Sequence, residues 1–190
     1  MANRNTQGFG LIPVGRLGGG PSIQGQGKYK IDAGHSTTIY NGECVKISSG
    51  YVVGGNGSAA DIIGVLNGIF FNAATTLKPT FSNFYKATIT PANSEDTTAF
   101  VIDDPFQQYV VGADAATGVA TFLETYDMNT SAGSDTTGKS SSTLDIATTS
   151  ANGKQFRMLR SAEDPENEDA TAAFHSVVVV STLNSFNGHN

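Results

Sequence analysis

The 190-residue sequence contains no tryptophan and only one cysteine. A single cysteine cannot form an intramolecular disulfide, and with three histidines it leaves few ligands for a structural zinc site. Charged residues make up 15% of the chain, against about 25% in an average soluble domain. The longest apolar stretch, at 62–71, is ten residues long, whereas a membrane helix needs about 20. These shortages argue against a disulfide scaffold, a zinc domain and a membrane-spanning protein.

The residues that are abundant favour strands. Isoleucine and valine together outnumber leucine three to one. Their β-branched side chains lose rotamers in a helix and pack well on a pleated sheet. The sequence therefore predicts an all-β fold, a compact sandwich or barrel of short antiparallel strands, with helix below about 15%.

Turn residues divide the chain into short strand-like segments. Strands are predicted at 28–32, 37–40, 43–48, 51–53, 61–71, 80–90, 98–103, 106–113, 155–160 and 173–183. The segment 119–126 fits either a strand or a short helix, and 129–143 is predicted to be a long polar loop. Asn41-Gly42 predicts a type I′ hairpin turn, and Asn67-Gly68 predicts a turn or a bulge inside an apolar run.

The first part of the chain differs in composition from the rest. Residues 1–30 carry a net charge of +4 and include eight glycines, whereas residues 31–190 carry −10. A glycine-rich segment loses much backbone entropy on folding and has little apolar surface to bury in return. We therefore predict an extended N-terminal arm at 1–27 and a β-rich domain at 28–190.

The arm is also the predicted partner-binding site. It contains a small apolar cluster suited to a neighbour's groove or sheet edge, with two arginines that can pair with acidic groups on that partner. The candidate residues are Arg4, Phe9, Leu11, Ile12, Val14, Arg16 and Leu17.

Two carboxylate clusters are candidate cation sites. Asp103-Asp104 precedes Pro105, and this order is typical of a turn that follows a strand. The acidic segment 163–169 lacks the ligand spacing and central glycine of a calcium loop. The sequence therefore favours a turn at the first cluster and a solvated acidic turn at the second.

The remaining reactive residues form no catalytic pattern. His35, His175 and His189 are not in a metal-ligand spacing, and His175 is predicted to be a packed or interface residue. Cys44 alternates with its neighbours in a predicted strand, which indicates a buried, inert thiol. No nucleophile and base occur together in a known motif. The sequence predicts no enzyme activity, no cofactor and no bound metal.

The basic residues within positions 1–30, including Lys28 and Lys30, are candidate contacts to nucleic acid. The pI is about 4.9, however, so the domain as a whole would repel phosphate. The sequence therefore favours a protein partner over nucleic acid, and it predicts no membrane partner.

Several motifs together resemble a known family. They are I-x-x-G-x-x-T-x-I-Y-N-G-E-x-V-K-I at 31–47, S-G-Y-V at 49–52, D-I-I-G-V-L-N-G-I-F-F at 61–71, V-I-D-D-P at 101–105, L-D at 144–145, G-K-Q-F-R-M-L-R at 153–160 and D-P-E-N-E at 164–168. The sequence resembles the capsid cement, or decoration, proteins of tailed bacteriophages, particularly marine ones. The resemblance covers most of residues 28–183 and lies in turns and core strands.

The resemblance implies a structural virion protein, made in the host bacterial cytoplasm. Such a protein binds the outer surface of the phage head and bridges subunits of the major capsid protein, with neighbouring copies of itself as further candidate contacts. The low charge and the many serine, threonine and asparagine residues suit broad, hydrated contacts. The net negative charge disfavours a place beside packaged DNA.

Other functions make different demands on the sequence. A head-fibre or tail protein is the runner-up and would be expected to contain repeats or a trimeric coiled coil. A carbohydrate-binding β-sandwich would need exposed aromatic residues, but the chain has no tryptophan and most phenylalanines fall in predicted strands.

Overall fold

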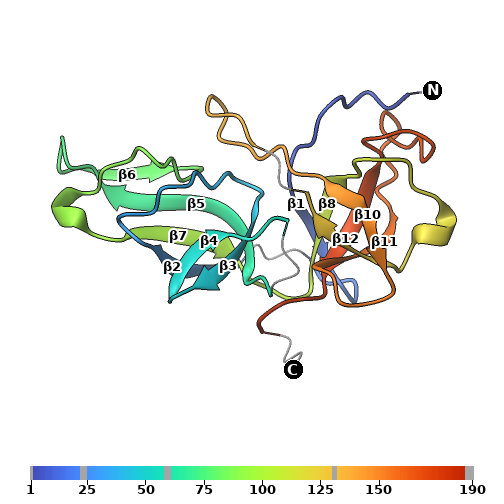
Figure 1. Cartoon of the computed structure of the whole chain (residues 1–190), viewed down its shortest axis with the longest axis horizontal. Helices are drawn as coiled ribbons and strands as arrows, with labels where there is room; N and C mark the ends of the chain where they lie inside the picture. Colours follow the sequence, from blue (N-terminus) through green and yellow to red (C-terminus); the bar gives the residue numbers. More distant parts are fainter. Residues whose placement is uncertain (1, 22–24, 58–60, 130–131, 187–190) are drawn as a thin grey trace.

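The computed structural model describes residues 2–21, 25–57, 61–129 and 132–186. These residues form two antiparallel sheets that pack against each other and lie along the longest axis of the molecule (Figure 1). The predicted all-β fold is confirmed as the sandwich alternative, since neither sheet closes into a barrel within the described ranges. Only two short 3₁₀ helices occur there, η1 (Ala92–Ser94) and η2 (Val119–Thr121).

Sheet A has six strands in the order β1-β8-β12-β11-β9-β10. Their bounds are β1 Ile12–Arg16, β8 Gln107–Gly112, β12 Ser176–Ser181, β11 Phe156–Ser161, β9 Thr125–Met128 and β10 Leu144–Ser150. We call residues 2–17 and 107–186 lobe A. The valine run of β12 is buried on both faces.

Sheet B also has six strands, of which five follow the order β2-β7-β5-β3-β4 and the sixth, β6, pairs with β5. Their bounds are β2 Gln26–Ile31, β7 Thr97–Ile102, β5 Gly64–Asn72, β3 Cys44–Ser48, β4 Tyr51–Gly54 and β6 Pro79–Ser82. We call residues 26–102 lobe B. The edge strands β2 and β4 approach each other, so the sheet curls around its own core.

Lobe B is inserted between two neighbouring strands of lobe A. The chain leaves sheet A at the end of β1, builds all of sheet B, and returns to sheet A at β8. There β8 pairs antiparallel with β1, with Arg16 opposite Gln107. The predicted division into an arm at 1–27 and a domain at 28–190 therefore does not follow the sheets, because the arm supplies the edge strand of sheet A and the start of β2.

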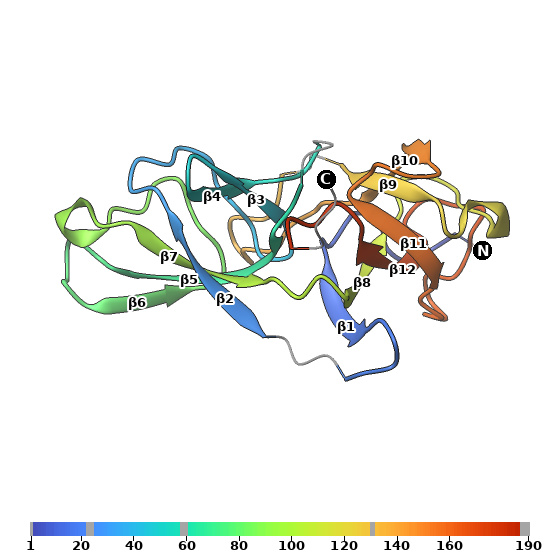
Figure 2. The ribbon, with the colours of Figure 1, turned by 90° about the horizontal axis from the view of Figure 1, so that it is seen from below.

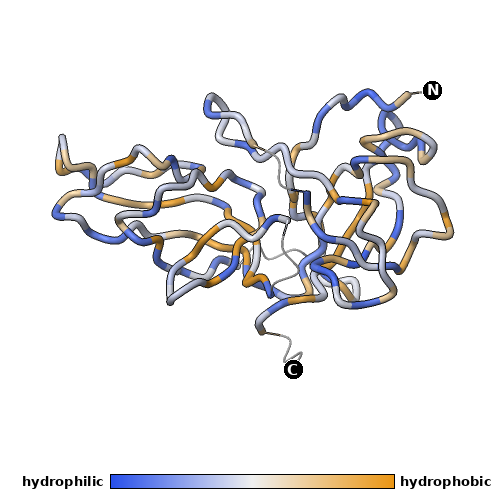
Figure 3. The backbone as a smooth tube through the Cα atoms, viewed as in Figure 1, coloured by the Kyte–Doolittle hydropathy of each residue, from blue (hydrophilic) through white to orange (hydrophobic). Residues whose placement is uncertain are grey.

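Each lobe has a hydrophobic core, and the two cores are built differently. Among the residues that the structure describes, the core of lobe B takes its side chains from lobe B alone, such as Ile31, Ile69 and Val101. The core of lobe A also takes buried side chains from lobe B: Cys44, Ile62, Val65 and Ile102. In Figure 3, hydrophobic residues accordingly lie along the strands of both lobes and in the region where the lobes meet. Hydrophilic residues predominate near the N-terminus.

The hairpin turns differ in part from the prediction. Residues 40–43 form a turn in which the Glu43 N–H donates to the Tyr40 carbonyl at 3.1 Å, but only Gly42 has a left-handed φ, of 82°. A type I′ turn needs two such residues, so this prediction is wrong. The left-handed pair is Ser49-Gly50, with φ of 51° and 87°, and it joins β3 to β4. A bulge between Leu66 and Gly68 confirms the prediction for Asn67-Gly68.

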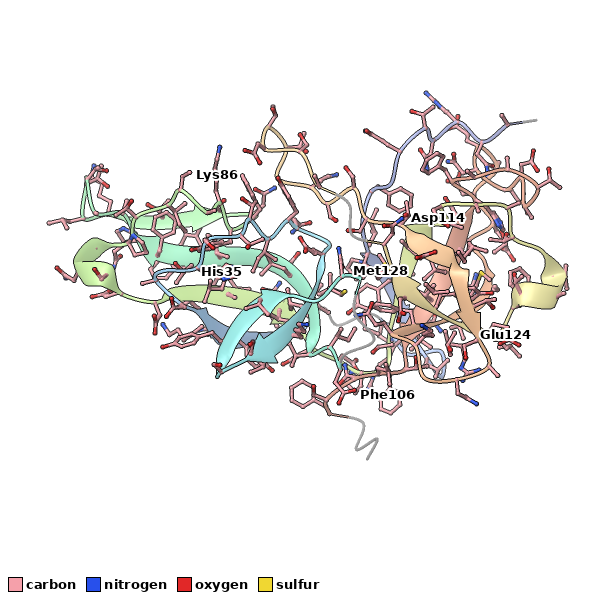
Figure 4. The ribbon with its side chains drawn as sticks, in the orientation of Figure 1. His35, Lys86, Phe106, Asp114, Glu124 and Met128 are labelled. Atoms are coloured by element: carbon pink, nitrogen blue, oxygen red, sulfur yellow. The ribbon has the colours of Figure 1, made fainter. Side chains whose placement is uncertain are left out.

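A loop of lobe A crosses to lobe B. We call residues 132–143 the clasp, which is the orange loop above the centre of Figure 1. The Tyr40 hydroxyl donates to Asp135 at 2.8 Å, and Lys86 pairs with the same carboxylate at 3.1 Å. The Asn83 amide donates to the Thr137 carbonyl at 2.7 Å. Lys86 points from lobe B towards the side from which the clasp approaches (Figure 4). The predicted polar loop thus has partners in the loops of lobe B.

Candidate partner-binding surfaces

The first residues of the chain bind the acidic turn of lobe A at 163–169. The Arg4 backbone N–H donates to the Glu166 carbonyl at 3.0 Å, and the Arg4 guanidinium is 2.5 Å from the Glu166 carboxylate. The Asn3 side chain donates to the Asp169 carbonyl at 3.0 Å and accepts from the Asp169 N–H at 2.9 Å. Arg4 was predicted to pair with an acidic group of another chain, but the acidic turn of its own chain holds it.

Leu11 and Phe9 also face their own chain. Leu11 is 2% exposed and belongs to the core of lobe A, and its N–H donates to the Gly42 carbonyl at 2.8 Å. Phe9 packs beside Gly112 of β8. Gly8 allows this close path, because a Cβ there would lie 2.1 Å from the Ser141 carbonyl oxygen. Glycine, which suggested a free arm, instead permits the segment to pack tightly.

The remaining candidate residues form a solvent-facing patch at the edge of sheet A. Ile12 and Val14 project from β1, and Leu17 follows the strand. The Leu17 N–H donates to the carbonyl of Phe106, at 2.8 Å. We call Ile12, Val14, Leu17 and Phe106 the edge patch, and each of these four residues is 46–48% exposed. Of the seven predicted residues, the structure therefore gathers Ile12, Val14, Arg16 and Leu17 in one place.

Arg16 contacts two residues of the connector between β7 and β8, beside the edge patch. Its Nε lies 2.9 Å from the Asp104 carboxylate, and its guanidinium lies 5.7 Å from the centre of the Phe106 ring. Phe106 itself projects where the two lobes meet (Figure 4). A charged group held against an aromatic ring orders the connector between β7 and β8.

The Asp103-Asp104-Pro105 segment is that connector, and the predicted turn is confirmed. The Gln107 N–H donates to the Asp104 carbonyl at 3.1 Å, and the Phe106 N–H donates to the Asp104 carboxylate at 2.9 Å. Asp103 accepts the Tyr29 hydroxyl at 2.8 Å. Burial, with help from this carboxylate, raises the pKa of Tyr29 to about 12. Both aspartates thus hold local structure.

The acidic segment 163–169 is a turn held by its own side chains. Asp164 accepts from the Glu166 N–H at 3.2 Å and from the Asn167 amide at 2.8 Å. Across the described residues, no three histidine, cysteine or acidic side chains are grouped as a metal site would require.

Histidine and cysteine side chains are packed. His175 is 1% exposed, with Nδ1 2.5 Å from the Thr117 hydroxyl and Nε2 3.0 Å from that of Ser161. Burial lowers the pKa of His175, which favours the neutral ring. Cys44 is buried with Sγ 2.8 Å from the Asn56 amide oxygen, and burial raises its pKa. The predicted packing of both residues is confirmed, and His189 lies outside the described residues.

Sequence reasoning missed an aromatic surface on lobe B. Phe70, Phe81 and Phe100 lie side by side on the solvent face of sheet B, with Phe81 73% exposed. Their strand positions suggested a core role. The available signal was alternation, because Phe100 stands between Ala99 and Val101, which both face the core.

Comparison with known proteins gives no significant match to a family model, a curated protein or a solved structure. No helix in the described ranges is long and apolar enough to cross a membrane.

Proposed function

We propose that the protein is a structural virion component that binds the outer surface of a tailed-phage head and links neighbouring major capsid subunits. The edge patch is the observation that supports this proposal most. It places apolar side chains beside an edge strand, a combination that folded proteins usually avoid unless a partner covers it.

The pairing of β1 fits such a contact. On one side β1 pairs with β8, and it is the last strand of sheet A. An added strand from another chain would gain backbone hydrogen bonds, and side chains such as Val14 would become buried in the contact. Many modest contacts of this kind stabilise a lattice by mass action, because bound copies favour the assembled shell.

The location can be tested on purified particles of the phage that encodes the chain. Peptide mass spectrometry should find the protein in the particles, and gold-labelled antibody should decorate the head. Labelling of the tail or of fibres would support the runner-up function instead. A protein missing from the particles would rule out both structural functions.

The contact can be tested with heads that lack the protein. Val14→Asp introduces a charge into the edge patch, and it should weaken attachment at least about tenfold because burial of an unpaired charge is costly. Val119→Asp is the matched control, since Val119 is 84% exposed and lies in η2, away from β1. Equal attachment of both variants and wild type would remove the edge patch from the proposed interface.

A further inference from the structure

The solvent face of sheet B carries three phenylalanine rings that are not part of the core of lobe B. The ring centres of Phe70 and Phe81 are 4.8 Å apart, and those of Phe81 and Phe100 are 6.4 Å apart. The opposite face of the same strands supplies Ile69 and Val101 to the core of lobe B. The three rings therefore form a contiguous cluster in which Phe81 is exposed and Phe70 and Phe100 are half-buried, and such a cluster in a soluble protein usually marks a contact surface.

A groove of about 440 Å³ runs between Phe81 and Phe100. Gly68 lies opposite Phe100 and leaves this space open, because a Cβ there would approach the backbone of β6. The groove is also lined by Gln26 and Asn67. Its lining therefore combines apolar residues with residues that carry amide groups, which suits a protruding apolar side chain of a partner.

The strands around the groove carry positive charge only. Lys28 stands opposite Phe100, and Lys30 stands opposite Thr98, with its ammonium group 3.0 Å from the Thr98 hydroxyl. Both lysines are exposed. No carboxylate occurs in β2, β5, β6 or β7, although the whole chain has a net charge of −6. Asp32 and Asp103 directly follow β2 and β7, so the positive charge is confined to the strands themselves, where the two lysines are complementary to an acidic surface.

Strands of sheet B that surround the aromatic rings lie along the same border of the molecule as β1, which carries part of the edge patch. In Figure 2, β6, β2 and β1 follow one another along the lower border of the view, and β3, β4, β9 and β10 lie on the opposite side. The strands β1 and β6, which carry residues of the edge patch and of the ring cluster, therefore lie along the same border of the molecule. A single large partner surface can contact both.

We propose that Phe70, Phe81, Phe100, Lys28 and Lys30, which we call the aromatic face, form a second attachment surface that docks on an acidic protein surface with a protruding apolar side chain. This inference rests on the proposed function, in which a major capsid subunit supplies that surface. Nucleic acid is the weaker candidate, because two lysines on a chain of net charge −6 neutralise few phosphates.

The experiment compares variants for attachment to heads that lack the protein. Phe81→Ser removes the most exposed ring, and Lys28→Glu with Lys30→Glu reverses the charge. The matched controls are Val119→Ser and Arg160→Glu, which change exposed residues of lobe A. Circular dichroism and melting temperature establish that each variant is folded.

We expect Phe81→Ser to weaken attachment at least about tenfold and the double charge reversal to do the same at low salt, with both controls unchanged. The reversal should also reduce the salt dependence of binding. If wild type attaches to the heads and both aromatic-face variants attach equally well, this inference is overturned and the proposed function remains intact. Failure of wild type to attach would overturn both.

A second measurement separates the two macromolecular partners. Wild-type protein is titrated against a fluorescent single-stranded oligothymidylate of twenty nucleotides at low salt. We expect no binding in the micromolar range. Micromolar binding that is lost in Phe81→Ser would overturn the assignment to a protein partner, because stacking bases would then explain the rings.

Discussion

Single residues of this protein combine predictable local roles with roles that depend on distant partners. The turn at Asp103-Asp104-Pro105 could be predicted because its hydrogen bonds join residues adjacent in sequence. The partners of Arg4 could not, since Glu166 is brought close only by folding. Glu43 is a third case, in which a carboxylate at a turn becomes half-buried on folding.

Glu43 is the residue whose surroundings oppose its charge most clearly. Its carboxylate accepts the Tyr40 N–H at 3.0 Å, and a Cβ at Gly54 would lie 2.9 Å from Oε1. Burial raises the pKa of Glu43 to about 7, and the Tyr40 hydrogen bond offsets only part of that effect. The folded protein thus binds this proton more tightly than the unfolded chain does.

Glu43→Gln should therefore change how stability depends on pH. In wild type, the contribution of Glu43 to the free energy of unfolding is greatest below about pH 4.5 and falls until about pH 7. Glutamine keeps an acceptor for Tyr40 and cannot ionise, so the variant should be more stable than wild type by about 2–4 kcal/mol at pH 8. The gain should be small at pH 4.5.

Urea unfolding at both pH values measures this difference. Glu95→Gln, at an exposed position, is the control and should change little at either pH. A gain for Glu43→Gln that is equal at pH 4.5 and pH 8 would contradict the assigned burial effect.

At the scale of elements, short strands were predictable and their partners were not. Alternation and turn residues located most strands of sheet B, including the bulge in β5. The strand β1 was missed because its glycine-rich surroundings suggest an extended arm. It exists through its pairing with β8, about ninety residues later in the chain. Similarly, 119–126 divides into η2 and the start of β9, which combines the two alternatives left open.

Two neighbouring residues can separate the structural and contact roles of the N-terminal segment. Leu11→Ala should lower the free energy of unfolding by about 2–5 kcal/mol, because it opens a cavity in the core of lobe A. Val14→Ala should change it by less than about 0.5 kcal/mol, since Val14 is half exposed. Chemical denaturation measures both. Equal effects would mean that Leu11 does not occupy the core of lobe A. That result would favour the predicted extended arm, in which Leu11 contacts a partner.

The clasp depends on glycines that face aromatic rings. A Cβ at Gly138 would lie 2.5 Å from the Phe84 ring, and Gly138 has a left-handed φ of 70°. The Gly138 carbonyl accepts the Asn41 N–H at 2.9 Å. These contacts make the clasp one of several connections between the lobes, together with the shared core of lobe A.

Gly138→Ala should loosen the clasp. The added methyl group must move Phe84 or the loop, and the left-handed backbone costs about 1–3 kcal/mol for a residue with a side chain. We expect faster hydrogen exchange at the Asn41 amide and a lower melting temperature. Gly118→Ala is the matched control, because a Cβ there meets no atom within 4 Å and φ is −156°. Equal exchange in both variants would contradict the clasp contact.

At the scale of the whole molecule, composition was enough to predict the all-β class but not the two-lobed arrangement. The ratio of β-branched residues to leucine reflects local strand preference. The insertion of lobe B between β1 and β8 depends on which distant strands pair, and short-range sequence patterns do not predict that pairing. The aromatic face was hidden for the same reason, because a strand pattern alone does not say which of its two faces a core will cover.

The shared core predicts that the two lobes unfold together. Cys44, Ile62, Val65 and Ile102 belong to lobe B in sequence but to the core of lobe A in space. Buried Gln155 adds a polar link, since its amide donates to the Gly55 carbonyl at 2.6 Å and accepts the Met128 N–H at 3.0 Å. Opening either lobe would expose apolar surface of the other.

Calorimetry should accordingly show one transition, with the calorimetric and van't Hoff enthalpies nearly equal. Gln155→Ala leaves two buried backbone groups without their partner, at about 1–3 kcal/mol each, so it should lower the melting temperature. It should also begin to separate the unfolding of the lobes, whereas Gln108→Ala, at a half-buried position on β8, should do neither. Two resolved transitions in wild type would show that the lobes are independent, and the shared core would then contribute little to holding them together.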